Sequence, residues 1–249
     1  MISVEVADFV QFIRMDRPEA RNALNSSAYV DLQRAFNEAS ADPDIRAVVI
    51  SGAGGSFCAG QDLKELGDVS AETLASFPFH AFIESLANCT KPVVAAVEGD
   101  AIGAGFTMLL HVDFVIAAQT ARFRLPFVAL GATAEAGSSA LLPAFFGPRM
   151  SARLLLTADW LLASDPEAQA LVTQVVVPGT AEAQASLLAG KLASLPSHSV
   201  ESIKRLLKAA HTDAVSAALA RERSELVRIA TAASSGHLGV AFASGVVSR

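Results

Sequence analysis

A single carboxylate stands among small residues in the stretch A-T-A-E-A-G at positions 132–137. Alanine, threonine and glycine surround Glu135, and no basic residue lies close to it in the sequence. A carboxyl group in such apolar surroundings loses hydration, which raises its pKa and makes its ionised form a stronger base. Glu135 is therefore a candidate for proton transfer. The alternative is that it caps a helix beginning near residues 136–138, because acidic residues favour the first turn of a helix.

Two glycine-rich turns offer backbone N–H groups that can bind an oxygen atom. Residues 51–66 read S-G-A-G-G-S-F-C-A-G-Q-D-L-K-E-L, and residues 98–107 read E-G-D-A-I-G-A-G-F-T. Small residues let a backbone approach a ligand closely, and N–H groups at the start of a helix have no partner within that helix. Two such turns can direct two donors at one oxygen atom, which is how an oxyanion hole is built.

The first turn fits neither of two common nucleotide-binding patterns. A dinucleotide-binding turn needs a third glycine where Phe57 stands, and a P-loop needs a G-K-[ST] sequence that does not follow. No histidine lies near Cys58 in the sequence, so packing explains this thiol better than nucleophilic catalysis. The histidines of the chain are scattered and fit no metal-binding spacing, so no metal site is expected.

Strands and helices alternate along the part of the chain that must position these groups. The predicted strands lie within residues 4–15 and at 47–51, 92–97 and 112–118. The predicted helices follow N-cap candidates at 25–27 and the glycines at 99–105, and two amphipathic helices occupy 192–211 and 213–230. The sequence thus predicts the α/β class, with an α/β core up to about residue 190 and a helical segment after it.

The composition limits the partners of the chain. Of its 249 residues, 52% are hydrophobic and 18% are charged, and the mean hydropathy is +0.41. A monomer of so apolar a composition would expose much hydrophobic surface, which predicts an oligomer that buries part of it. A net charge of −6 without any run of basic residues argues against nucleic acid as a partner. Two cysteines, no leader sequence and no apolar stretch of about 18 residues predict a cytoplasmic protein without a membrane span.

Four motifs, taken in order, resemble those of the crotonase superfamily, also called the enoyl-CoA hydratase/isomerase family. They read D-R-P-E-A-R-N-A-L (16–24), F-C-A-G-Q-D-L (57–63), K-P-V-V-A-A-V-E-G-D-A-I-G-A-G (91–105) and P-F-V-A-L-G (126–131). The resemblance implies a crotonase-type spiral of ββα repeats in residues 1–190, followed by a helical segment in residues 191–249 that assembles a homotrimer or a dimer of trimers. It also implies an acyl-CoA substrate, so coenzyme A arrives with the substrate and no separate cofactor is needed.

The same resemblance implies roles for residues in the two turns. The backbone N–H groups of Gln61 and Ala104 would form an oxyanion hole for the thioester oxygen. The residues implied to contact CoA are Ala59 and Asp62, near the adenine, and Arg21 and Lys64, near the phosphates, although surface cations are often only solvated. The candidate walls of the acyl pocket are Phe77, Phe79 and Phe82, and core packing explains these aromatic residues equally well.

The hydratases of this family use two glutamates, and the chain departs from them at both positions. Thr107 and Phe127 stand there, where they would line the acyl pocket and cannot act as acid or base. The Δ3,Δ2-enoyl-CoA isomerases have one acidic residue in the pattern L-G-x-x-x-[ED]-x-G, which here reads L-G-A-T-A-E-A-G (130–137). The resemblance is closest to these isomerases. It implies that Glu135 alone moves a proton from C2 to C4 of a 3-enoyl thioester.

Two other functions stay open from the sequence. The same oxyanion hole could serve the isomerisation of a cyclic or aromatic-derived CoA thioester. Alternatively, the chain is a non-catalytic homologue that binds acyl-CoA, since both hydratase glutamates are replaced. The C-terminal stretch H-L-G-V-A-F-A-S-G-V-V-S-R (237–249) also lacks the lysines that family members place near CoA.

Overall fold

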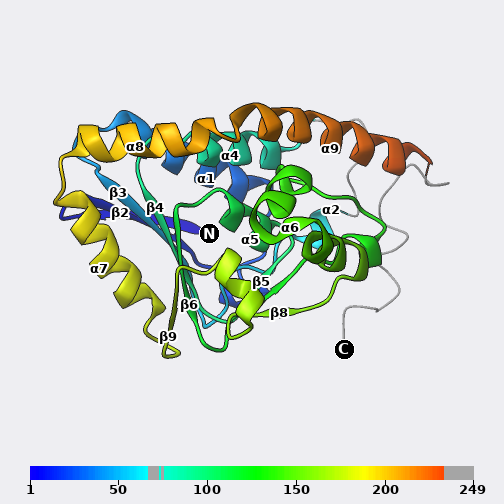
Figure 1. The fold of residues 1–249 in the computed structure, drawn as a ribbon, viewed down its shortest axis with the longest axis horizontal. Helices are drawn as coiled ribbons and strands as arrows, with labels where there is room; N and C mark the ends of the chain where they lie inside the picture. Colours follow the sequence, from blue (N-terminus) through cyan, green and yellow to red (C-terminus); the bar gives the residue numbers. More distant parts are fainter. Residues whose placement is uncertain (67–72, 74–75, 233–249) are drawn as a thin grey trace.

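The computed structural model describes residues 1–66, 73 and 76–232, and Figure 1 shows its strands flanked by helices. The strands are β1 (Ile2–Ala7), β2 (Val10–Met15), β3 (Ala47–Gly52), β4 (Val93–Val97), β5 (Asp100–Ile102), β6 (Phe114–Ala118), β7 (Arg122–Arg124), β8 (Leu161–Leu162) and β9 (Gln174–Val176). The longer helices are α1 (Ser26–Ala41), α4 (Pro78–Ala87), α6 (Ser138–Thr157), α7 (Ala181–Ala193), α8 (Ser197–Ala209) and α9 (Thr212–Ala232). Short helical turns are η1 (Pro18–Ala20), α2 (Leu63–Leu66), α5 (Ala104–Thr107), η2 (Met108–Leu110), η3 (Val128–Leu130) and η4 (Pro166–Ala170).

Six strands form the larger sheet, in the order β1-β2-β3-β4-β6-β9. β1 and β2 form an antiparallel hairpin whose turn residues, Asp8 and Phe9, both have positive φ angles. Every other neighbouring pair in this sheet is parallel. All residues of β4 are buried, as are those of β3 except Gly52. Continuous apolar runs are typical of parallel strands covered on both faces, and the strands predicted at 47–51 and 92–97 are confirmed.

Helices cover both faces of the larger sheet. α7 turns an alanine toward the sheet at every fourth residue, where it meets Val49 and Val94. α1 and α4 pack against each other on the opposite face, and their aromatic side chains belong to the main hydrophobic core. α1 begins where the sequence predicts, because the Asn25 side chain accepts a hydrogen bond from the Ala28 N–H.

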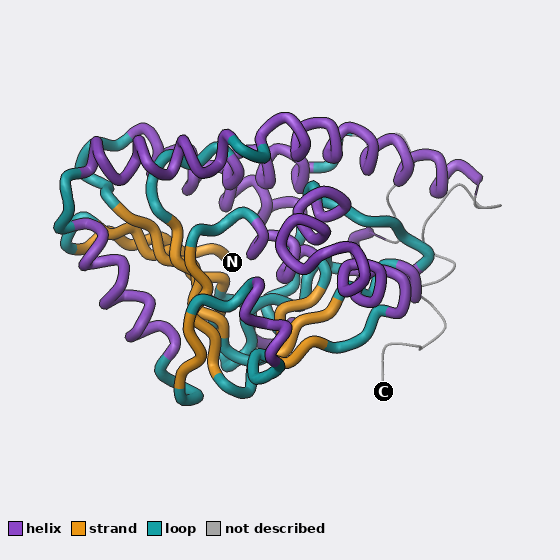
Figure 2. The backbone as a smooth tube through the Cα atoms, viewed as in Figure 1, coloured by secondary structure: helices purple, strands orange, loops and turns teal. Residues whose placement is uncertain are grey.

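A smaller sheet contains β5, β7 and β8. Isolated bridges between Cys58 and Ala101 and between Leu24 and Gln61 continue this layer toward the start of the chain. Successive turns of the spiral thus add one strand to the larger sheet and a short strand or bridge to the smaller layer, and Figure 2 shows both groups of strands. The predicted α/β class is confirmed. The helix expected after the second glycine-rich turn is present as α5 and η2, and three residues of the turn itself pair with β7 as β5.

α8 and α9 follow one another along one edge of the molecule, above α4 in Figure 1. Lys204 anchors this edge, since its ammonium group donates to the Asp113 carboxylate at 2.6 Å and also to the Lys91 carbonyl oxygen. None of the described helices is long and apolar enough to cross a membrane.

The outer face of α8 carries large apolar side chains that are exposed in the single chain, namely Ile203, Leu206 and Leu207. Assembly through this helical segment stays a prediction. The boundary expected near residue 190 falls inside α7, and the division of the chain into residues 1–190 and 191–249 stays a prediction as well.

Candidate active site

Backbone hydrogen bonds hold the two glycine-rich turns side by side. The Cys58 N–H donates to the Asp100 carbonyl oxygen at 3.0 Å, and the Ile102 N–H donates to the Cys58 carbonyl oxygen at 2.9 Å. Glycine is required at position 60, because a Cβ atom there would lie 2.6 Å from the Ile102 carbonyl oxygen and 3.3 Å from the Ala104 nitrogen. The φ angle of Gly60, +86°, also favours glycine. The two turns therefore meet at one place.

Gln61 and Ala104 have free backbone N–H groups at this junction. Within the described part of the chain, neither N–H donates to a hydrogen-bond acceptor. Asp62, rather than Gln61, donates to the Leu24 carbonyl oxygen at 2.8 Å. Ala104 is the first residue of α5, where an N–H has no partner within its helix. The neighbouring Gly103 N–H is already used by β7, so Gln61 and Ala104 are the donors available to bind an oxygen atom.

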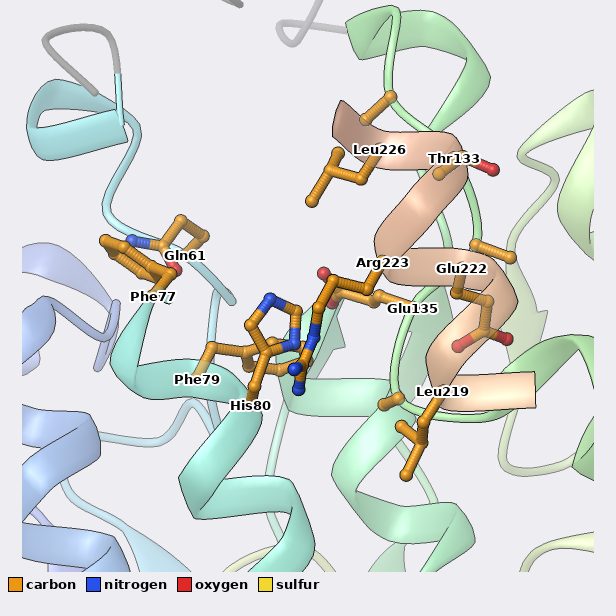
Figure 3. A pocket seen from close by; sticks show the side chains of 13 residues that line it. Gln61, Phe77, Phe79, His80, Thr133, Glu135, Leu219, Glu222, Arg223 and Leu226 are labelled. Carbon is orange, nitrogen blue, oxygen red and sulfur yellow. The ribbon is translucent and has the colours of Figure 1, made fainter. Parts of the chain in front are cut away.

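A small cavity is lined both by Gln61 of this junction and by Glu135, whereas Ala104 does not line it. Its wall is formed by Gln61, by the aromatic side chains at the start of α4, by residues 132–136 and by one side of α9. Figure 3 shows Gln61 and Phe77 on one side, Leu219 and Glu222 of α9 on the other, and His80, Glu135 and Arg223 between them. Segments far apart in the sequence therefore meet around one carboxyl group.

Burial raises the pKa of the Glu135 carboxyl group to about 8, although the residue as a whole is only partly buried. The negative charge of Glu222 raises this pKa further. The Thr107 hydroxyl favours the ionised form, but it does not reach the geometry of a full hydrogen bond. A pKa close to neutral pH suits proton transfer, because the group can then accept a proton and release it again.

Glu135 lies on a tight turn that leads into α6. Ala136 and Gly137 both adopt left-handed backbone conformations, with φ angles of 58° and 72°. The Nε2 atom of His111 lies 2.7 Å from the Ala136 carbonyl oxygen. Glu222 of α9 accepts hydrogen bonds from the Gly137 N–H at 2.7 Å and from the second N–H of α6 at 2.8 Å. Glu222 is therefore the carboxylate that caps α6, and this role does not fall to Glu135.

Known proteins resemble this chain in both sequence and fold. Residues 5–241 match the family described as enoyl-CoA hydratase/isomerase. The chain belongs to this family. A solved enoyl-CoA hydratase/isomerase from Pseudoalteromonas atlantica is 34% identical with a TM-score of 0.88, and the match covers 93% of this chain and 92% of that one. The crotonase-type α/β spiral is thus confirmed.

Two relatives in this family carry names of different reactions. The 1,2-epoxyphenylacetyl-CoA isomerase of Escherichia coli is 32% identical over 223 residues, which cover 86% of this chain and 84% of the relative. The crotonyl-CoA hydratase of Syntrophomonas wolfei is 34% identical over 199 residues, which cover 78% of this chain and 75% of the relative. The chain is an enzyme of the enoyl-CoA hydratase/isomerase family, and membership alone does not choose between hydration and isomerisation.

The two positions at which hydratases of the family have glutamates are both buried. Neither Thr107 nor Phe127 lines the cavity, contrary to the expectation that both would line the acyl pocket, but Thr107 lies close enough to Glu135 to influence its pKa. The Tyr29 hydroxyl is also buried near Glu135 and, like that of Thr107, has no hydrogen-bond partner among the described residues. Burial raises the pKa of Tyr29, and the charge of Glu135 raises it further. Unpaired polar groups around Glu135 can therefore bind water or a polar atom of a ligand.

The aromatic residues expected in the acyl pocket have two different environments. Phe77 and Phe79 line the cavity beside Glu135, although both are largely buried. Phe82 lies one turn further along α4 and is fully buried, with its ring centre 5.7 Å from that of Tyr29 and 6.2 Å from that of Phe36. It packs in the core and does not line the cavity.

The residues expected to contact CoA are joined in two pairs. The Arg21 carbonyl oxygen accepts the Ala59 N–H at 2.9 Å, and the Asp62 carboxylate accepts the Lys64 N–H at 3.1 Å. Asp62 also pairs with the Arg17 guanidinium at 2.7 Å. Partial burial on its own would raise the pKa of the Asp62 carboxyl group. The hydrogen bonds from Arg17 and from the Lys64 N–H have the larger combined effect, so the pKa is lowered. The Arg21 and Lys64 side chains are exposed, and their contacts with CoA stay a prediction. The C-terminal stretch 237–249 lies outside the described residues.

Two residues that build this site are missed by sequence reasoning. Asn22 is buried, and its Nδ2 atom donates to the Ala53 and Ser56 carbonyl oxygens, each at 2.8 Å, while its Oδ1 atom accepts the Arg17 N–H at 2.9 Å. This amide holds the loop that precedes the first oxyanion donor. The only sequence feature that could have indicated a role for Asn22 is its position within the motif at residues 16–24. Glu222 has no such signal, because an amphipathic helix predicts exposed glutamates.

Metal and thiol chemistry have no support in the described ranges. No cluster of histidine, cysteine, aspartate and glutamate side chains there could hold a metal ion. Cys58 is fully buried, and burial raises the pKa of its thiol to about 12. Because the thiolate is the nucleophile, Cys58 is inert at neutral pH and serves packing, as predicted.

Proposed function

We propose that the protein converts a 3-enoyl-CoA into a 2-enoyl-CoA, with Glu135 as the single proton carrier. The observation that carries this proposal is the Glu135 carboxyl group itself, whose pKa is about 8 and which lines the same cavity as Gln61, a residue with a free backbone N–H group. A carboxyl group with this pKa is a strong enough base to attack an acidic C–H bond and still carries the proton long enough to return it.

The reaction needs one carboxylate and one oxyanion hole. Ionised Glu135 takes a proton from C2 of the thioester, and the electron pair of the C–H bond moves toward the carbonyl group to form a dienolate. The N–H groups of Gln61 and Ala104 stabilise the negative charge on the thioester oxygen. Glu135 then returns the proton at C4, so that the double bond moves from C3–C4 to C2–C3 and the carboxylate is regenerated.

Hydration is the less well supported reaction. Thr107 and Phe127 offer no carboxylate where the hydratases of the family have theirs. Glu222 lines the same cavity, but both of its oxygens already accept backbone N–H groups. One carboxyl group is therefore available for chemistry, which suits the transfer of a single proton within the substrate.

The second candidate substrate is a cyclic or aromatic-derived CoA thioester. The chain is 32% identical to a protein named 1,2-epoxyphenylacetyl-CoA isomerase, and two aromatic rings, Phe77 and Phe79, line the cavity. We also propose that the protein binds acyl-CoA without a further cofactor. The exposed apolar side chains of α8 support its assembly as a homotrimer or a dimer of trimers, which light scattering can test.

The deciding experiment follows conversion of a linear 3-enoyl-CoA to 2-enoyl-CoA. Glu135→Gln is expected to lower kcat by about 10²–10⁴-fold while the thioester still binds, and Glu167→Gln, at an exposed position in η4, should leave kcat unchanged. An unchanged rate in Glu135→Gln rules out the proposed role. Turnover of a cyclic thioester alone favours the second candidate. Binding without turnover of either substrate identifies a non-catalytic homologue.

A further inference from the structure

We propose that Glu222 is a positioning residue that holds the turn carrying Glu135 and keeps a fixed negative charge beside it. The inference rests on the proposed role of Glu135. Glu222 belongs to α9 and lies 85 residues from Gly137, whose N–H it binds. It therefore joins the last described helix of the chain to the proposed catalytic turn.

Both oxygens of the Glu222 carboxylate are used by the backbone. Oε2 accepts the Gly137 N–H at 2.7 Å, and Oε1 accepts the Ser139 N–H at 2.8 Å. The residue is only 6% exposed, and Figure 3 shows its carboxylate pointing away from Gln61 and Phe77. The N-terminus of α6 stabilises a carboxylate in this position through its free N–H groups and its dipole. Glu222 thus serves the turn and leaves Glu135 as the acid/base.

The turn needs such support because its backbone conformation is unfavourable. A left-handed conformation costs a residue other than glycine about 1–2 kcal/mol, and Ala136 has a φ angle of 58°. Glu222 holds one end of the turn, and His111 holds the Ala136 carbonyl oxygen at 2.7 Å. A displacement of about 1 Å in a catalytic group can cost about 10²-fold in rate. Loss of the Glu222 contacts would displace Glu135 in this way.

The charge of Glu222 acts on Glu135 as well, since after burial it is the second cause of the raised pKa. Among the described residues, His80 and Arg223 line the same cavity, His111 contacts the turn, and Tyr29 lies near Glu135, with Cys58 and Glu65 acting on that tyrosine in turn. Raised pKa values keep the tyrosine and the thiol protonated at neutral pH, arginine is always charged, and a pKa of about 4 keeps His111 neutral. Because His80 lines the cavity beside Glu135, the test includes a His80 variant.

The test compares Glu222→Gln and Glu222→Asp with a matched control, Glu225→Gln. Glu225 lies on the same helix, is exposed and pairs with Arg228 at 2.8 Å, so its replacement removes a charge from α9 without touching the turn. Two quantities are measured with and without His80→Gln. One is the pH dependence of kcat/KM, and the other is the titration of the ¹³C-labelled Glu135 carboxyl group, assigned by its loss in Glu135→Gln.

Each variant has a distinct expected result. Glu222→Gln should move the rising limb of the pH profile and the ¹³C titration to lower pH by about 0.5–1 unit, because a like charge is removed. It should also lower kcat by about 10-fold or more, because one N–H contact is lost. Glu222→Asp keeps the charge but is shorter, so it should lower kcat without moving the limb. Glu225→Gln should change neither quantity.

The proposal is overturned if Glu222→Gln loses stability or rate while the titration of Glu135 stays in place, because Glu222 would then be a helix cap only. If that variant does not fold, an unchanged kcat in Glu222→Asp overturns it. The ¹³C titration needs no turnover and separates this proposal from the proposed function. If the ¹³C titration of Glu135 shifts in Glu222→Gln but the natural protein isomerises no thioester, the proposed function is contradicted and the proposed role of Glu222 is not.

Discussion

The Nε2 atom of His111 lies 2.7 Å from the carbonyl oxygen of Ala136, the residue that follows Glu135. A carbonyl oxygen can only accept, so Nε2 carries the proton in this contact. Burial lowers the pKa of His111 to about 4, and the Lys208 ammonium adds to this lowering, although the bond to Ala136 opposes both. His111 is therefore a neutral donor throughout the pH range in which Glu135 titrates.

The buried ring of His111 predicts a loss of stability in mild acid. Its pKa is about 4 in the folded chain, against the ordinary histidine value of 6.5 expected in the unfolded chain, so the unfolded chain binds more protons between these pH values. The free energy of unfolding should therefore fall as the pH drops from about 6.5 to about 4, by up to about 3 kcal/mol from this group. In His111→Gln the amide can still donate a hydrogen bond to the Ala136 carbonyl oxygen but has no group that titrates in this range. This variant should therefore lose less stability between pH 6.5 and pH 4. Urea unfolding at pH 7 and pH 4.5 measures the effect, and equal losses in both proteins would contradict it.

Glu135 predicts the opposite dependence on pH. Its pKa is about 8 in the folded chain, against the ordinary glutamate value of 4.5 expected in the unfolded chain, so its contribution to stability is complete below about pH 4.5 and is lost as the pH rises through about 8. Glu135→Gln should therefore be more stable than the natural protein at pH 9, by up to about 5 kcal/mol, and similar to it at pH 4.5. Denaturant unfolding at both pH values tests this. Equal stability at pH 9 would show that the carboxyl group is not desolvated.

Gly60→Ala should impair the junction of the two glycine-rich turns. The added Cβ would lie 2.6 Å from the Ile102 carbonyl oxygen and 3.3 Å from the Ala104 nitrogen, so the second oxyanion donor must move. We expect kcat to fall by about 10²-fold. Gly55→Ala is the matched control, because Gly55 has a φ of +76° and no atom within 4 Å of an added Cβ. It should cost about 1 kcal/mol of stability and leave kcat near that of the natural protein. Similar kcat values for both variants would argue against an oxyanion hole at this junction.

Asn22→Ala should destabilise the loop before Gln61. Removing the amide leaves the Ala53 and Ser56 carbonyl oxygens and the Arg17 N–H without their partner in a buried place. Such losses cost about 1–3 kcal/mol per group, so a decrease of about 3 kcal/mol in the free energy of unfolding is expected. Asn25→Ala, which removes the N-cap of α1, should cost only about 1 kcal/mol. Denaturant unfolding ranks the two variants, and the reverse order would contradict this account of Asn22.

Much of the fold follows from patterns that are local in the chain. The apolar runs at 47–51 and 92–97 form buried parallel strands, and Asn25 begins α1 as an N-cap residue must. Alternation, helical spacing and capping act over a few residues, so each can be read where it occurs. The family is equally visible, because its glycines and their neighbours are contiguous motifs.

The spatial relations among these motifs could not be read in this way. Phe77 is the N-cap residue of α4 and Phe82 lies within that helix, yet Phe77 lines the cavity whereas Phe82 packs against α1. The spacing of aromatic residues does not reveal which neighbour each side chain meets. Similarly, an acidic residue before α6 was a plausible cap by sequence, but the cap comes from a different helix.

The sequence by itself determined the α/β class, the two glycine-rich turns and the placement of Glu135 among small residues. Only the tertiary structure decided that Glu222 and His111 hold the turn around Glu135 and that Asn22 holds the loop before Gln61. The physical reason is that these contacts join residues far apart in the chain. The Glu222 contact exists because α9 packs against α6, and the His111 and Asn22 contacts join segments 25 and 31 residues apart, so no local pattern encodes any of them.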